Sequence, residues 1–287
     1  ASNGQVTFTQ TLIGTALDIS GDIDVDGTTN LDAVDVDGAV NFAADVTFAD
    51  GADIITASAG TSNFRAGVNA GNSIASGGNY NVTVGDEAGT ALTTSDNNVA
   101  VGYSALSSTT TGDNNTAIGY NSLATNVDGD RNTAVGASAL STMEPATAGD
   151  TYNTAVGFAA GQLVSTGTNN TLMGGQAGDA LTTGYNNVAL GRNALSTEDT
   201  GRNSVAIGMN ALNDQNADVD NYNTAVGYAA GGDVTTGVQN TIVGGLAGDA
   251  LTDADYNVAV GYNALTSDTL GGYSTAIGRN TLYTQNF

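Results

Sequence analysis

Residues 115–140 read NTAIGYNSLATNVDGDRNTAVGASAL and contain one motif twice, Asn-Thr-Ala-aliphatic-Gly, which ends at Gly119 and again at Gly136. The motif recurs along the chain, and nine of the twelve intervals between successive motif glycines equal the interval from Gly119 to Gly136. A fixed short period is typical of a solenoid, in which each repeat stacks on the one before. The motif glycines are Gly67, Gly85, Gly102, Gly119, Gly136, Gly157, Gly174, Gly191, Gly208, Gly227, Gly244, Gly261 and Gly278.

Each motif has the alternation of a β-strand. β-Branched or aliphatic residues stand one and three positions before the glycine, as Thr116 and Ile118 do, usually with Ala between them. We expect these two positions to share a face and to point inward. The chain is therefore predicted to be all-β, with a parallel β-solenoid or β-roll of about 13 coils and a 17-residue period over residues 63–287.

The coils are of two kinds. Seven have Leu four residues after the motif glycine and are called Leu coils; the other six have Gly there and are called Gly coils. In Gly coils an aliphatic residue stands seven after the motif glycine, as Leu181 does, whereas most Leu coils have a polar residue at that place, as in Thr109 and Glu198. Interiors are filled to nearly crystalline density, so this exchange predicts that both places share one stacked core.

The Asn four residues before most motif glycines has a structural interpretation, because stacked amides can hydrogen-bond from coil to coil. A single roll this thin has a small core, so we expect neighbouring chains to cover its Ala-rich face in an oligomer.

Residues 1–62 differ from the repeat and predict a segment of short β-strands that connects the roll to other proteins. Within it, Asp22, Asp24 and Asp26 with Gly27 spell D-x-D-x-D-G, the opening of a calcium loop. The twelfth position is Ala33, where a calcium loop of this kind needs Glu. The alternative is a strand with a solvated acidic face, and we expect no other cofactor.

Composition excludes several classes of function. The chain has 29 acidic and 5 basic residues, a formal charge of −24, and no Lys, His, Cys or Trp. Nucleic-acid binding needs a basic surface, and catalytic triads, thiol nucleophiles and Schiff bases need the missing side chains. No apolar run of about 18 residues is present to cross a membrane. Carboxylates remain, but nothing marks out the pair that a glycosidase needs, so we expect no enzyme.

The segments NSVAIGMNAL (203–212), NTAIGYNSL (115–123) and NTAVGASAL (132–140) resemble the head repeats of trimeric autotransporter adhesins, and similar repeats occur in bacteriophage tail-fibre proteins. The resemblance covers residues 63–287 and implies a left-handed parallel β-roll in a homotrimer. The chain shows no heptad stalk and no C-terminal membrane-anchor strands, and its coil is longer than the usual adhesin-head coil.

We therefore expect a phage tail fibre, a virion appendage that contributes to host-surface attachment. Its partners would be its own copies, other virion or surface-fibre proteins reached through residues 1–62, and a host glycan or protein. The alternatives are a secreted adhesin or filament subunit at the cell surface and, less favoured, a fibre enzyme that degrades polysaccharide.

Two aromatic columns and two long intervals are the candidate recognition features. Aromatic residues follow several motif glycines, and four of them are candidate glycan contacts; the alternative is a packing ladder between coils. A second column precedes the motif Asn. Arg131 and Arg202 lie in turns and Arg192 and Arg279 lie just after motif glycines, and all four are expected to pair with Asp. Recognition is expected at the non-repeating residues 141–152 and 213–222 or at the tip of the roll. The four candidate contacts are Tyr103, Tyr120, Tyr228 and Tyr262.

Overall fold

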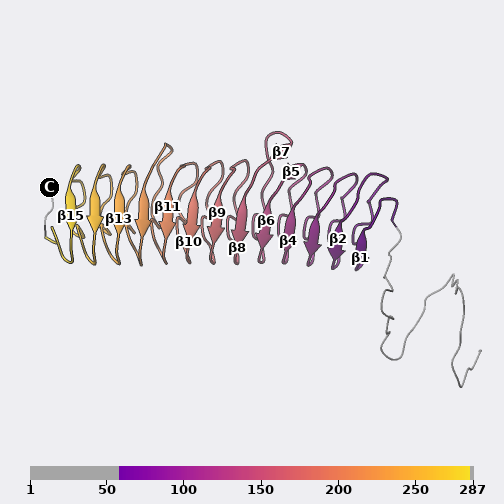
Figure 1. Ribbon diagram of the computed structural model, residues 1–287, viewed down its shortest axis with the longest axis horizontal. Coiled ribbons are helices and arrows are strands. Elements are labelled where there is room, and N and C mark those ends of the chain that lie inside the picture. The colour runs from indigo at the N-terminus through magenta and orange to yellow at the C-terminus, as the bar shows by residue number, and fades with distance from the viewer. Residues whose placement is uncertain (1–57, 285–287) are drawn as a thin grey trace, which may run out of the picture. The chain divides into compact units, whose positions relative to one another are not determined.

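The computed structural model describes residues 58–284, which form a single β-roll without a helix. Thirteen three-residue strands stand side by side in one parallel sheet, joined by long loops that return on the other side of the roll (Figure 1). The strands are β1 (Phe64–Ala66), β2 (Val82–Val84), β3 (Val99–Val101), β4 (Thr116–Ile118), β6 (Thr133–Val135), β8 (Thr154–Val156), β9 (Thr171–Met173), β10 (Val188–Leu190), β11 (Val205–Ile207), β12 (Thr224–Val226), β13 (Thr241–Val243), β14 (Val258–Val260) and β15 (Thr275–Ile277).

The strands pair in the register of the repeat. Across β3 and β4, for example, Val99 lies opposite Thr116, which holds the same place in the next coil. The predicted parallel solenoid of about 13 coils is confirmed. The predictions for residues 1–57, including the short-strand segment and Asp22, Asp24 and Asp26, lie outside the described residues.

The prediction of which strand face points inward is wrong. The central Ala of the strands is fully buried, as in Ala100, Ala117 and Ala134, whereas the flanking residues are half-buried or, like Ile118, exposed. Alternation defines two faces but does not say which one is inside.

The inward place is Ala in most strands, but it also accepts the larger Leu172 in β9 and Ile242 in β13, both fully buried. The Ala-rich column is consequently core, so the prediction that neighbouring chains cover it is also wrong. The outer surface of the sheet carries the Thr, Val and Ile side chains.

The motif glycines are required by both conformation and space. Their φ angles are positive, +138° at Gly119 and +139° at Gly136, a region that other residues rarely adopt. A Cβ on Gly119 would lie 2.5 Å from the carbonyl oxygen of Gly136 in the next coil. Any side chain here would push adjacent coils apart.

The buried Asn column forms a hydrogen-bonded ladder, as the sequence predicts. The Oδ1 atom of Asn98 accepts the backbone N–H of Asn115 at 2.9 Å, and Asn115 does the same for Asn132. Most of the Nδ2 atoms also donate across their own coil, as from Asn115 to the carbonyl of Gly129 at 2.8 Å; Asn257 is an exception, because its Nδ2 has no partner among the described residues. These amides satisfy polar backbone groups that the roll removes from water.

The predicted exchange of the aliphatic side chain between the fourth and the seventh place after the motif glycine is confirmed, because both places fill the same interior volume. In Leu coils Leu106, Leu123 and Leu195 are fully buried. In the Gly coil at Gly248, a Cβ on that residue would lie 2.8 Å from Cδ1 of Leu251, which occupies the interior instead. The backbone is the same in both kinds, with φ of +52° at Gly248 and +55° at Leu265.

The polar residues at the seventh place of the Leu coils are buried, which the sequence did not indicate. Thr109, Asn126, Glu198 and Asp268 have no exposed surface. Three of them accept the backbone N–H of a glycine three residues further on, as Glu198 Oε1 does from Gly201 at 2.7 Å. The side chain thus satisfies a turn amide inside the roll.

Candidate recognition surface

The column of aromatic side chains after the motif glycines is exposed, as a binding surface requires. Tyr103, Tyr120, Tyr228 and Tyr262 are each about half exposed. The rings of Tyr103 and Tyr120 stack with centroids 5.7 Å apart and an interplanar angle of 12°. Tyr228 and Tyr262 are separated by the coil of Gly245, and a Cβ on that glycine would lie 3.6 Å from Cδ2 of Tyr262. The first pair is therefore a packing ladder, whereas the second pair keeps its ring faces apart.

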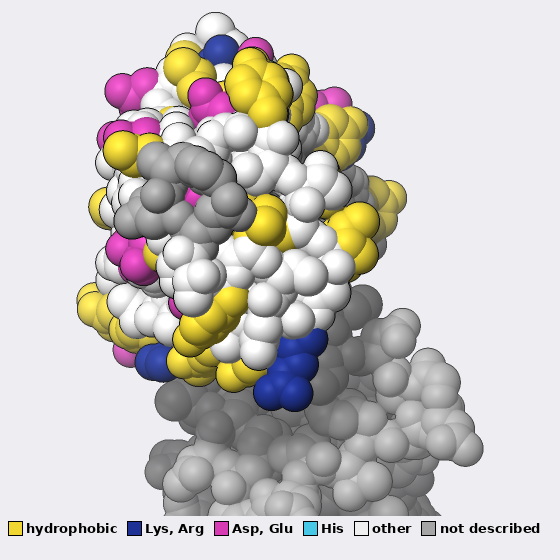
Figure 2. All heavy atoms as spheres, turned by 90° about the vertical axis from the view of Figure 1, so that its left-hand side faces the viewer, with side chains coloured by type: hydrophobic (Ala, Val, Ile, Leu, Met, Phe, Trp, Pro, Cys, Tyr) yellow, Lys and Arg dark blue, Asp and Glu magenta, His cyan; other side chains and the backbone are white. Residues whose placement is uncertain are grey.

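The second aromatic column, which precedes the motif Asn, likewise contains both stacked and unstacked rings. Tyr80, Tyr152, Tyr222 and Tyr256 are exposed, and the Tyr256 ring stacks on Tyr273 at 4.8 Å. In the view along the roll from its β15 end, hydrophobic side chains lie at several separate places on the rim, with polar groups between them (Figure 2).

Two loops interrupt the repeat and rise on the same side of the roll (Figure 1). The first insertion loop, residues 141–152, follows β6 and carries β7 (Gly149–Asp150), which pairs with β5 (Gly129–Asp130) in a separate two-stranded sheet. The second insertion loop, residues 213–222, follows β11, and its Asp220 forms an isolated parallel bridge with Arg202. Each insertion thus adds a short rung of backbone pairing outside the main sheet.

Both insertion loops place an Asp against an Arg of the preceding coil, as the sequence predicts for Arg131 and Arg202. Arg131 forms an ion pair with Asp150, and its guanidinium lies 5.6 Å from the ring centroid of Tyr152. The Tyr152 hydroxyl donates to the second oxygen of Asp150 at 2.9 Å.

The second cluster has the same composition. Arg202 pairs with Asp220, and its guanidinium lies 5.3 Å from the ring centroid of Tyr185. Exposed ion pairs of this kind contribute about 0–1 kcal/mol each, so their effect is to orient the loops. Arg192, in contrast, lies 3.7 Å from the sulfur of Met209.

The buried carboxylate of Glu198 binds the second insertion loop through hydrogen bonds. Glu198 Oε2 accepts hydrogen bonds from the side chains of Gln215 at 2.9 Å and Asn221 at 2.8 Å, and from the backbone of Ala217 at 3.4 Å. Burial raises the pKa of the Glu198 carboxyl above its ordinary value, although these donors and the Gly201 amide oppose the shift. The sequence contains no signal for this network beyond the polar seventh place.

The first insertion loop is held by Glu144 in a similar way. Its Oε2 atom accepts the backbone N–H of Val127 at 2.6 Å, and its own backbone N–H donates to the carbonyl of Ser165 at 2.9 Å. Burial raises the pKa of the Glu144 carboxyl; the hydrogen bond from Val127 opposes that shift and the nearby charge of Asp128 adds to it.

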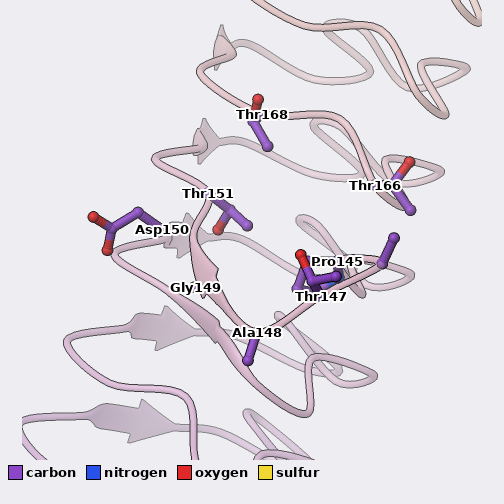
Figure 3. Close-up of a pocket in the computed structure, with 9 residues that line it drawn as sticks. Pro145, Thr147, Ala148, Gly149, Asp150, Thr151, Thr166 and Thr168 are labelled. Carbon is purple, nitrogen blue, oxygen red and sulfur yellow. The ribbon is translucent and has the colours of Figure 1, made fainter.

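Beside the first insertion loop lies a groove of about 350 Å³, called the loop groove (Figure 3). Residues 145–151 line it from one coil and Thr166 and Thr168 from the next. The sequence located this region through its long interval and its single proline, Pro145, but not the groove itself.

Within residues 58–284, no three His, Cys, Asp or Glu side chains gather as a metal site would require. The same residues include no helix of the length and apolarity needed to cross a membrane. Comparison with protein-family models, curated proteins and solved structures finds no match to this chain.

Proposed function

We propose that this chain is a structural and adhesive fibre protein, most specifically a bacteriophage tail fibre that helps its virion attach to the host surface and catalyses no reaction. The observation that carries the proposal is the use of the repeated interior positions. Motif glycines, the Asn ladder and the exchanged aliphatic side chains all serve coil stacking. The non-repeating polar clusters lie in the two insertion loops, as expected of a rigid support that presents recognition loops.

The assembled form is proposed to be a homotrimer, with the outer sheet face between chains. This face consists of the residues one and three positions before each motif glycine, and it exposes Ile118, Met173, Val243 and Ile277. An apolar stripe along a roll stays in contact with water in a monomer and leaves it in an oligomer, so its burial favours association. Residues 1–62 are proposed to join the fibre to other virion or surface-fibre proteins.

Light scattering tests the assembly. The chain has a mass of 28.4 kDa, so a trimer would weigh three times as much. The matched variants are Ile118→Asp on the outer sheet face and Val219→Asp in the second insertion loop, both at exposed aliphatic residues. The trimer should dissociate in the first variant and persist in the second. A monomeric parent protein would contradict the trimer.

Immunogold electron microscopy with antibodies against the chain tests whether the protein is part of a phage particle. Labelled tail appendages of phage particles are expected. Label on cell surfaces instead would favour the secreted adhesin or filament subunit. Incubation with host polysaccharide should release no reducing ends, and release would instead support the fibre enzyme.

A further inference from the structure

The loop groove is the place in the described part of the roll where the first insertion opens a concave surface. Its volume of about 350 Å³ lies within the range of roughly 300–1,000 Å³ that is typical of small-molecule sites. Figure 3 shows the Thr166 and Thr168 side chains on one coil and Pro145 and Thr147 on the loop beside it. The two walls come from different coils, so the groove exists only when these coils are stacked.

Hydrogen bonds at both ends fix the loop wall of the groove. At its start, the Glu144 backbone N–H donates to Ser165 in the next coil at 2.9 Å. At its end, β7 pairs with β5, and Thr151 Oγ1 donates to Asn132 Oδ1 at 2.8 Å. A proline at residue 145 further restricts the backbone. A wall held in this way loses little conformational freedom when a ligand binds.

The lining alternates hydroxyl and apolar groups. Within residues 58–284, no hydrogen bond engages the hydroxyls of Thr147 and Thr166. Ala148 and Pro145 supply apolar surface, and Gly149 leaves its backbone open, since a Cβ there would have no atom within 4 Å. Hydroxyls that both donate and accept, next to apolar surface, match a sugar ring, which has hydroxyls on its edge and C–H groups on its faces.

The hydroxyl of Thr168 is engaged on one side only. It accepts a hydrogen bond from the side chain of Asn169 at 3.1 Å. A hydroxyl that accepts one hydrogen bond keeps its own proton and a second lone pair for another partner. Thr168 can therefore still bind a ligand hydroxyl.

Charge indicates which sugars fit. No Arg lines the groove, and the chain carries a formal charge of −24, so acidic sugars and phosphates would meet no counter-charge. The Asp150 carboxylate points away from the groove threonines (Figure 3) and is already engaged by Arg131 and Tyr152. A cationic ligand therefore finds no free carboxylate directed at it. A neutral ligand fits best.

We propose that the loop groove binds a neutral saccharide unit of a surface glycan. The hydroxyls of Thr147, Thr166 and Thr168 exchange hydrogen bonds with the sugar hydroxyls, and Pro145 and Ala148 contact a C–H face of the ring. The biological source of the glycan rests on the proposed adhesive function, whereas sugar binding is a property of the protein alone.

The test uses the full chain and a panel of neutral and acidic oligosaccharides. Saturation-transfer NMR identifies the ligands, and calorimetric titration measures their dissociation constants. The hydroxyl-removing variant is the double change Thr166→Val and Thr168→Val. Residues 157–208 correspond to residues 227–278, so the chain repeats a four-coil unit in which Val238 holds the place of Thr168. The repeat therefore tolerates Val there. Thr236→Val, at the place of Thr166 in that same coil, is the control outside the groove.

Neutral oligosaccharides should bind the parent and the control, and the double variant should bind about tenfold more weakly because two hydrogen bonds are lost. Ala148→Trp, which fills the groove, should abolish binding. Binding of no neutral sugar, a preference for acidic sugars or for peptides, or unchanged affinity in both groove variants would overturn the proposal. Sugar binding by a monomer absent from virions would refute the fibre function but leave the groove assignment intact; a virion-borne trimer that binds no sugar would do the reverse.

Discussion

Leu coils and Gly coils share one backbone path but fill it from different places. In a Leu coil such as that of Leu265, the aliphatic side chain comes four residues after the motif glycine, and the seventh place is free for a buried polar group. In the Gly coil of Gly248 the aliphatic Leu251 comes from the seventh place itself. The difference shows that each coil must fill the same interior volume with an aliphatic side chain, which can come from either of the two places. It also explains why buried polar networks such as that of Glu198 occur in Leu coils.

The largest effect is expected from emptying a Leu coil in the middle of the roll. Leu195→Ala should lower the free energy of unfolding by about 2–5 kcal/mol, because it removes a fully buried side chain and leaves a cavity. Leu282→Ala is the control, since Leu282 lies in the last described coil and is 37% exposed. Chemical denaturation of both variants measures the difference; equal losses would contradict the assignment of Leu195 to a closed core.

Adding a large side chain to the interior of a Gly coil should destabilise the fold less than emptying a Leu coil. Gly248→Leu is expected to destabilise the roll by about 1–3 kcal/mol, because the new side chain competes with Leu251 for the same space. Adding Leu251→Asn converts the coil to the Leu kind and should recover much of the loss, since Asn126 fills that place in a Leu coil. A double-mutant cycle measures the coupling. Additive effects would show that the two places do not share a volume.

The buried carboxylate of the Leu coils predicts a pH dependence. Because the pKa of Glu198 is raised in the folded state, its contribution to stability is fully present below its unfolded pKa and is lost as pH rises through the folded value. Glu198→Gln should remove this component, at most about 1.4 kcal/mol per pH unit. Denaturation of both proteins between pH 4 and 7 gives the difference. A parallel pH profile for the two proteins would be the contrary result.

The smallest effect is expected from the stacked aromatic side chains on the outside of the roll. Tyr103→Ala removes one stacked ring pair and should cost about 0.5–1.5 kcal/mol. Tyr228→Ala, outside both stacked pairs of the described residues, should change stability less. Thermal unfolding of the two variants compares them, and a larger loss for Tyr228→Ala would contradict a stabilising role for the stacked pair.

The stacking of coils could be predicted from sequence because it leaves repeated marks. The constant interval between motif glycines and the exchange between Leu265-type and Leu251-type positions both require a shared, in-register interior. The inward face of the strand could not be predicted in this way. The usual preference for buried β-branched residues favoured Thr116 and Ile118, but the structure buries Ala117, and alternation alone does not say which of the two faces is inside.

The candidate site was predictable in place but not in form. The two long intervals between motif glycines mark the insertion loops, and both fall where a Leu coil is followed by a Gly coil. Charge predicts that Arg131 pairs with an Asp, but the choice of Asp150 comes from the structure. The loop groove could not be predicted in this way, because one of its walls belongs to the next coil. The distance between Thr147 and Thr166 across the groove depends on the path of the loop rather than on its composition.

The spacing of the two insertion loops bears on how genes of this kind change length. Asp150 and Tyr152 recur as Asp220 and Tyr222, one four-coil unit later in the chain. Unequal recombination that gains or loses this unit preserves both the order of coil kinds and the loop pattern, whereas a gain of one coil alters the order. Inherited variants of the roll would therefore differ in length by steps of about 19 Å, four strand spacings, and each step would add or remove one insertion loop.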